Sequence, residues 1–190
     1  MWAMGIREGT LGVEDCVRAW QALVRPVLEY GTIVWGGDKW EQAEKVQREM
    51  GKMILRCSSK MANEVVLGEL GWWTLKGRRD FLILNYWGKI VGEMSPSRLV
   101  YHVYHTSRSR YDIHHKNNSD HGMHSLNKWC NNIHTLLKSI DMEEAWNNNA
   151  LEPSEAKQWR STIKTKIKKG KKCNGEKECN TNPNCAHTGS

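Results

Sequence analysis

The sequence predicts an all-α protein, and three observations lead to this prediction. Apolar residues recur at helical spacing in one segment after another. The alternation of apolar and polar residues that is typical of β-strands does not persist anywhere in the 190 residues. Glycine, proline and short polar breaks separate the helical segments, as expected at helix ends. Apolar residues make up 39% of the chain, which is below the globular average and predicts a core over only part of its length.

After an N-terminal extension (residues 1–12), the first predicted helix runs to Gly31. Pro26 lies inside this segment and removes one backbone donor, so we expect a kink there. The apolar side chains recur at i, i+3, i+7 and i+11, which places them on one stripe of the helix: Val17, Trp20, Val24 and Leu28.

Four further helices are predicted before residue 107, and together with the first they form a small bundle over residues 13–106. One covers residues 38–56, with Asp38 as its N-cap. Its inward positions are Ala43, Val46, Met50, Met53 and Ile54. A short helix starts at Asn63 and ends at Gly71, which takes the C′ position. The segment 74–93 is apolar on more than one side and is therefore expected at the centre of the bundle, and 97–106 is a last short helix.

The composition changes abruptly after this bundle. Residues 107–122 are polar and offer almost nothing to bury, which predicts a linker. Residues 123–170 carry two weaker helical patterns, one of them following Pro153 and continuing through Ile167. Residues 171–190 are polar and contain three cysteines, and we expect them to be disordered.

The net charge of +7 and the pI of about 9.1 favour acidic partners such as nucleic acid or an anionic membrane surface. Lys45, Arg48, Lys52 and Arg56 are spaced to form one basic edge of the second helix. Residues 160–172 carry seven positive charges and no acid. This second run fits nucleic-acid binding, a nuclear localisation signal, a solvated tail or an anionic membrane surface, of which the last is the least favoured.

Four blocks in the first half resemble the thumb of non-LTR (LINE-type) retrotransposon reverse transcriptases. They are Leu-Val-Arg-Pro-Val-Leu-Glu-Tyr-Gly at 23–31 followed by Val34-Trp35, Ala-Glu-Lys-Val-Gln-Arg at 43–48, Val-Val-Leu-Gly-Glu-Leu-Gly-Trp at 65–72 followed by Arg78-Arg79, and Tyr86-Trp87. The likeness covers about residues 13–106 and fades towards residue 160, where only spaced tryptophans continue it. It implies a thumb-like bundle that cradles a template–primer duplex.

The resemblance and the charge pattern together suggest nonspecific binding of RNA, DNA or a hybrid. The residues expected to contact phosphate are Arg25, Lys45, Arg48, Lys52, Arg78, Arg79, Lys164 and Lys168.

The catalytic part of such an enzyme is not expected in this chain. A polymerase holds two Mg²⁺ ions on closely placed carboxylates, which the family carries as a Tyr-x-Asp-Asp turn and a further Asp. The aspartates here are never adjacent. We therefore expect a non-catalytic fragment with no cofactor.

Two sets of side chains have the chemistry of metal ligands, but neither is expected to bind metal. Cys173, Cys179, Cys185 and His187 lack the C-x2-C spacing of structural zinc sites, so free thiols are favoured over zinc. The histidines at 114, 115, 121 and 124 are read as incidental.

Two other hypotheses stay open. Exposed tryptophans on a half-completed bundle would make a protein–protein interaction module, and Trp72-Trp73 includes one ring expected in the core and one that can be exposed. The second hypothesis is that the chain is an inert translated relic. The chain has neither a secretory signal nor an apolar run long enough to span a bilayer, so we expect an intracellular protein without a membrane partner, and the 160–172 run favours the nucleus.

Overall fold

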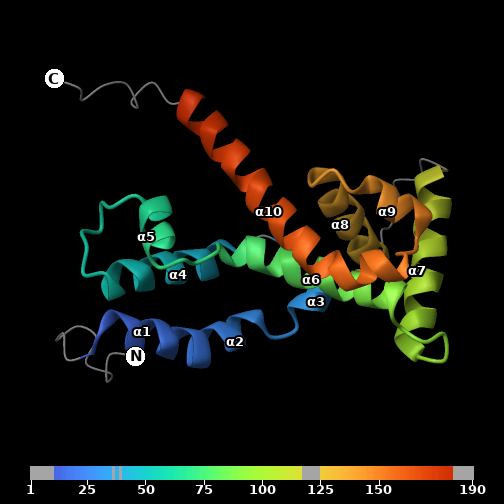
Figure 1. The fold of residues 1–190 in the computed structure, drawn as a ribbon, viewed down its shortest axis with the longest axis horizontal. Coiled ribbons are helices and arrows are strands. Elements are labelled where there is room, and N and C mark those ends of the chain that lie inside the picture. Colours follow the sequence, from blue (N-terminus) through green and yellow to red (C-terminus); the bar gives the residue numbers. More distant parts are fainter. Residues whose placement is uncertain (1–10, 36, 39, 117–124, 182–190) are drawn as a thin grey trace. The chain divides into compact units, whose positions relative to one another are not determined.

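The computed structural model describes residues 11–35, 37–38, 40–116 and 125–181. Over these ranges the chain is helical and contains no strand, which confirms the all-α prediction (Figure 1). The chain divides into two compact units, Met1–Leu82 and Ile83–Ser190. The boundary falls inside helix α6 (Leu75–Gly92), so the first predicted bundle, 13–106, is not one compact unit.

The first helical stretch of the N-terminal unit has three segments: α1 (Val13–Ala19), a π-helical turn η2 (Trp20–Val24) and α2 (Arg25–Glu29). The Arg25 N–H donates to the Trp20 carbonyl, five residues earlier. Pro26 comes next and has no N–H to continue an α-helical ladder, so the predicted irregularity takes the form of a π turn. The stretch ends at Tyr30 and Gly31, and the glycine adopts a φ of 67°. A one-turn helix that was not predicted, α3 (Thr32–Trp35), follows.

Helix α4 (Glu41–Ile54) confirms the second predicted helix, although its first residue differs. The prediction that Asp38 caps it is wrong, because Trp40 occupies the N-cap position. Its buried face also differs in part. Ala43 and Ile54 are buried as predicted, whereas Val46 is 48% exposed and Gln47 is only 3% exposed. Its Nε2 donates to the Trp73 carbonyl at 2.9 Å, whereas its Oε1 is buried without a hydrogen-bond partner in the described part of the chain.

Helix α5 (Asn63–Glu69) packs on α4, and its end confirms the glycine prediction. Gly71 has a φ of 62° and donates to the Gly68 carbonyl at 3.0 Å, while Trp72 N–H donates to the Leu67 carbonyl at 2.8 Å. These two bonds form a Schellman motif. At the other end, Ala62 rather than the predicted Asn63 is the N-cap.

The apolar core of the N-terminal unit gathers around Cys16 and Ile54. Partly buried side chains pack against them: Leu11, Val17, Met50, Met53, Leu70 and Trp72. Trp72 stacks on the buried ring of Trp20 with centroids 5.3 Å apart. This core therefore joins the first helical stretch to α4 and to the chain after α5.

Helix α6 begins where Glu44 of α4 caps its N-terminus. The Glu44 carboxylate accepts the backbone N–H groups of Leu75 at 3.3 Å and Lys76 at 2.5 Å. The two-sided apolar pattern predicted for this segment is confirmed by its buried residues: Leu75, Phe81, Ile83, Leu84, Trp87 and Ile90.

In its described residues, the C-terminal unit contains the rest of α6 and four more helices: α7 (Leu99–Lys116), α8 (Ser125–Ser139), α9 (Glu143–Asn148) and α10 (Pro153–Thr181). The linker prediction is wrong over 107–116, because α7 continues through these residues. Ser107, Arg108 and Tyr111 are 4%, 8% and 6% exposed, so this polar segment has a buried face. Residues 117–122 lie outside the described part.

The prediction of a disordered tail also differs from the structure, since the α10 backbone is helical through residues 171–181. The rest of that tail, 182–190, lies outside the described residues. The two weaker helices predicted for 123–170 correspond to α8 and α10, and α9 was not predicted.

Tryptophans dominate the core of the C-terminal unit. Trp87 lies 6.2 Å from Trp146 and 5.4 Å from Trp159, centroid to centroid, and all three are at most 4% exposed. Trp159 from α10 reaches α6 at Gly88, where a Cβ atom would lie only 2.1 Å from its Nε1. The Nε1–H donates to the Leu84 carbonyl at 2.9 Å. None of the described helices is both long and apolar enough to cross a bilayer.

Candidate nucleic-acid interface

Arg25 and Arg78 converge on one carboxylate. Arg25 Nε lies 3.9 Å from Glu29 Oε1, and Arg78 Nε donates to the same oxygen. The Glu29 side chain is 11% exposed, whereas those of Arg25 and Arg78 are 30% and 32% exposed. The structure thus brings together two predicted phosphate contacts that are far apart in the sequence.

Arg79 departs from the prediction. Its side chain is 1% exposed, so it cannot reach a phosphate in this conformation. Nη1 donates to the Asp38 carbonyl at 3.2 Å, while Nε and Nη2 are buried without a hydrogen-bond partner in the described part of the chain. Arg78 and Arg79 are adjacent on α6, and successive helical positions point about 100° apart, so only one of them faces solvent.

The basic edge on α4 is largely engaged within the chain. Arg48 pairs with Glu41 at 2.8 Å, and Lys52 donates to the Ser59 carbonyl at 2.7 Å. Arg56 lies beyond the helix with a φ of 52° and donates to the Leu11 carbonyl at 3.4 Å. Lys45 is exposed. An exposed ion pair of this kind is worth little and can exchange for a phosphate contact.

Helix α10 carries a second row of four cations, and all four are exposed, whereas Arg48 and Lys52 of the α4 edge are only partly exposed. Lys164 and Lys168, both predicted contacts, are exposed, and so are Lys157 and Arg160, which the site prediction did not include. These residues are spaced i, i+3, i+7 and i+11, which is the same spacing that predicts the basic edge on α4. The apolar side of the helix is buried in the unit through Trp159, Ile163 and Ile167. The row is therefore fixed in orientation.

The tryptophan pair 72–73 is only partly exposed. Trp72 stacks on Trp20, and Trp73 meets Phe81 edge-on at 5.7 Å. Neither ring is free to stack on a base in this conformation.

The first helical stretch and α3 instead expose a set of aliphatic and aromatic side chains, which we call the apolar stripe. Its members are Leu23 (55% exposed), Val27 (72%), Tyr30 (83%), Val34 (73%) and Trp35 (42%). Leu23 lies in the π turn, Val27 lies in α2, and Tyr30 is the C-cap of α2. Trp35 lies against Gly31 and meets Trp40 edge-on at 5.5 Å.

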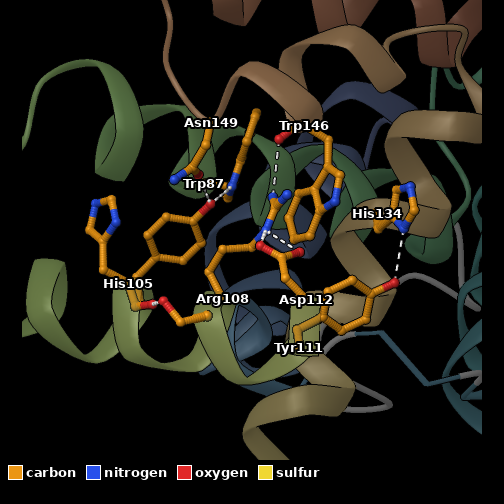
Figure 2. Close-up of polar contacts among 10 residues, drawn as sticks. Trp87, His105, Arg108, Tyr111, Asp112, His134, Trp146 and Asn149 are labelled. Atoms are coloured by element: carbon orange, nitrogen blue, oxygen red, sulfur yellow. Dashed lines mark hydrogen bonds and ion pairs between the residues drawn. The ribbon is translucent and has the colours of Figure 1, made fainter. Parts of the chain in front are cut away.

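Figure 2 shows a polar cluster in the C-terminal unit that the sequence did not reveal. The Arg108 guanidinium lies 3.6 Å from the Trp146 ring centroid, donates to the Trp146 carbonyl at 3.0 Å and is held by Asp112 at 2.9 Å. His134 stacks on Trp146 and bonds the Tyr111 hydroxyl at 2.9 Å. Trp146 is thus in contact with a guanidinium and an imidazole. These contacts tie α7, α8 and α9 together.

A second branch of the cluster runs through Tyr104. Its hydroxyl accepts from Trp87 Nε1 at 3.0 Å and donates to Asn149 Oδ1 at 2.5 Å. Burial raises the pKa of Tyr104 to about 12 and that of the nearby Cys130 to about 11. Both groups are therefore neutral at physiological pH, and their burial fits a packing role.

The described residues include no group of three or more His, Cys, Asp or Glu side chains placed to hold a metal ion. The Cys and His residues weighed for zinc lie outside the described residues or have side chains that are not described, as do the four histidines at 114–124.

No family model, curated protein or solved structure matches this chain. The resemblance to LINE-type reverse transcriptases therefore stays a prediction from its sequence blocks.

Proposed function

We propose that this chain derives from the thumb region of a non-LTR retrotransposon reverse transcriptase and binds nucleic acid through the phosphate backbone, without sequence preference. The observation that carries the binding proposal is the basic row on α10: Lys157, Arg160, Lys164 and Lys168. Eleven residues of α-helix separate its ends, so the row extends about 16 Å and can follow several phosphates of one strand.

The chemistry of this interface is electrostatic. Each phosphate neutralised by a cation releases counterions, so binding weakens steeply as salt rises. No base-reading geometry is proposed, because backbone contacts carry no sequence information. Polymerase activity is not part of the proposal, since the sequence has no adjacent aspartates to hold a metal pair.

The test is fluorescence anisotropy of a labelled RNA–DNA hybrid against the full chain at several salt concentrations. A chain truncated before α10 is unsuitable, because Trp159, Ile163 and Ile167 belong to the core. We instead compare a triple Lys→Gln variant at 157, 164 and 168 with a control that changes three exposed lysines elsewhere, at 60, 89 and 138. Both variants lose the same charge. The row variant should bind more weakly with a flatter salt slope, and equal loss in both would reject the α10 row as the site.

The apolar stripe favours a second function, a protein–protein interaction module. Its five side chains are between 42% and 83% exposed, and large exposed apolar patches are typical of interaction sites. This alternative predicts association that salt does not weaken. Light scattering after size exclusion, with Val27→Gln and Tyr30→Gln as variants, tests it: salt-independent association that both substitutions abolish supports the module, and a strict monomer removes self-association.

A further inference from the structure

We propose that Arg25, Glu29 and Arg78 form a phosphate clamp, in which Glu29 is the residue that positions the two guanidiniums. The inference rests on the proposed nucleic-acid binding and adds a second, separate site to it, in the N-terminal unit. Its ligand is one phosphodiester group of a nucleic-acid backbone.

One carboxylate oxygen lies close to both arginines. Arg78 of α6 donates its Nε–H to Glu29 Oε1 across 49 residues of sequence, and Arg25 Nε of α2 forms an ion pair with the same oxygen at 3.9 Å. The carboxylate is 11% exposed and lies inward, whereas the guanidiniums are about one-third exposed. Glu29 thus holds Arg78 by a hydrogen bond and Arg25 by an ion pair, and both arginine side chains remain partly open to solvent.

Most donors of the two guanidiniums remain available. A guanidinium carries five N–H donors, and here only the Nε–H of Arg78 donates to the carboxylate, while Arg25 is held by the ion pair. In the described part of the chain, the Nη groups of Arg25 and Arg78 have no hydrogen-bond partner. Paired Nη–H donors match the oxygens of a phosphate better than a lysine ammonium does.

Two guanidiniums and one carboxylate leave a net charge of +1 at a half-buried position. A salt bridge that served only to join α2 to α6 would need a single arginine, and a second one adds desolvation cost without a carboxylate of its own. One phosphodiester group carries the single negative charge that balances the set.

The effect of removing Glu29 on nucleic-acid binding distinguishes a purely electrostatic role of this residue from a positioning role. If Glu29 acted only through its charge, removing it would strengthen the binding of a polyanion. If Glu29 positions the arginines, removing or shortening it weakens binding, because the guanidiniums lose their fixed orientation. Glu41, which pairs with Arg48 at 2.8 Å on the exposed side of α4, provides the matched control.

The experiment measures anisotropy of the labelled RNA–DNA hybrid across salt for the full chain and for Glu29→Asp, Glu29→Gln and Glu41→Gln. Glu29→Asp keeps the charge but is too short to reach both arginines. It should weaken binding about tenfold, the loss expected for one charge-assisted hydrogen bond, and lower the salt slope by about one. Glu29→Gln should bind no better than the unmodified chain, whereas Glu41→Gln should bind equally or more tightly. Circular dichroism of each variant confirms that the helices are retained, and Glu29→Gln, which keeps the side-chain length, serves if the aspartate variant unfolds.

Two results overturn the clamp. If both Glu29 variants bind as tightly as the unmodified chain, or if Glu29→Gln gains affinity as Glu41→Gln does, Glu29 is not a positioning residue, and the α10 row can still account for binding. If the unmodified chain does not bind the hybrid at all, the clamp and the proposed function both fail.

Discussion

Replacing Gly88 with alanine should destabilise the C-terminal unit, because the added Cβ would collide with a buried indole. The new Cβ would lie 2.1 Å from Nε1 and 2.2 Å from Cδ1 of Trp159. The indole cannot shift easily, because it is 4% exposed, packs against Trp87 and donates to the Leu84 carbonyl. The contact is with a rigid ring, and not with the end of a flexible side chain.

The size of the effect follows from what the indole loses. Expelling a buried tryptophan costs about 3–5 kcal/mol, and the helix gains about 1 kcal/mol from alanine in place of glycine. We therefore expect the free energy of unfolding to fall by about 3 kcal/mol. Gly68→Ala is the matched control, since no atom lies within 4 Å of the Cβ it would add on α5. That variant should be unchanged or up to about 1 kcal/mol more stable.

Urea denaturation followed by far-ultraviolet circular dichroism measures both variants. A Gly88→Ala midpoint equal to or above that of the unmodified chain would refute the close packing of Trp159 on α6. A loss of stability in Gly68→Ala as large as in Gly88→Ala would show that the effect is a general property of glycine substitution.

Three further predictions concern the C-terminal unit and the thiols. The free energy of unfolding should fall as pH rises from about 9 to about 12, because burial raises the pKa of Cys130 from 9.0 to about 11 and that of Tyr104 from 10.0 to about 12. The stabilisation is complete below the pKa values of the unfolded chain, where both groups are neutral, and is lost as pH rises through the raised pKa values of the folded chain. Urea midpoints that stay flat over this range would contradict the prediction. Arg108→Met should lower stability by about 2 kcal/mol through loss of the Asp112 and Trp146 contacts, and an unchanged melting temperature would speak against the cluster. Maleimide labelling with peptide mapping should modify half-buried Cys57 before buried Cys16 and Cys130, and similar rates at all three would show that the cores open readily.

The local patterns of the sequence predicted the helices well where the spacing of apolar residues along one segment decides the structure. The helix expected at 74–93 is α6 (Leu75–Gly92), and the glycine expected to end the helix after Asn63 is Gly71. Both signals depend on neighbours within a few residues. Caps were predicted less well, since Asp38 and Asn63 suit the N-cap chemically but the helices begin elsewhere.

Features that depend on distant partners were not predictable. Residues 107–116 look like a linker because Arg108 and Asp112 are polar, and Trp146, 38 residues from Arg108, provides a surface against which Arg108 is buried. The basic residues at 78 and 79 are equivalent in sequence, yet α6 buries one and turns the other towards Glu29. Spacing identifies a charged row on a helix but not which of its members already have partners.

The π turn before Pro26 makes the length of its segment matter as much as its composition. Deleting one residue, for example Ala22, would let α-helical pairing resume and rotate everything that follows by about 100° about the helix axis. Glu29 would then no longer face Arg78, and the apolar stripe would turn relative to the buried side of Trp20. A conservative substitution in this segment should therefore be tolerated far more readily than a one-residue gap.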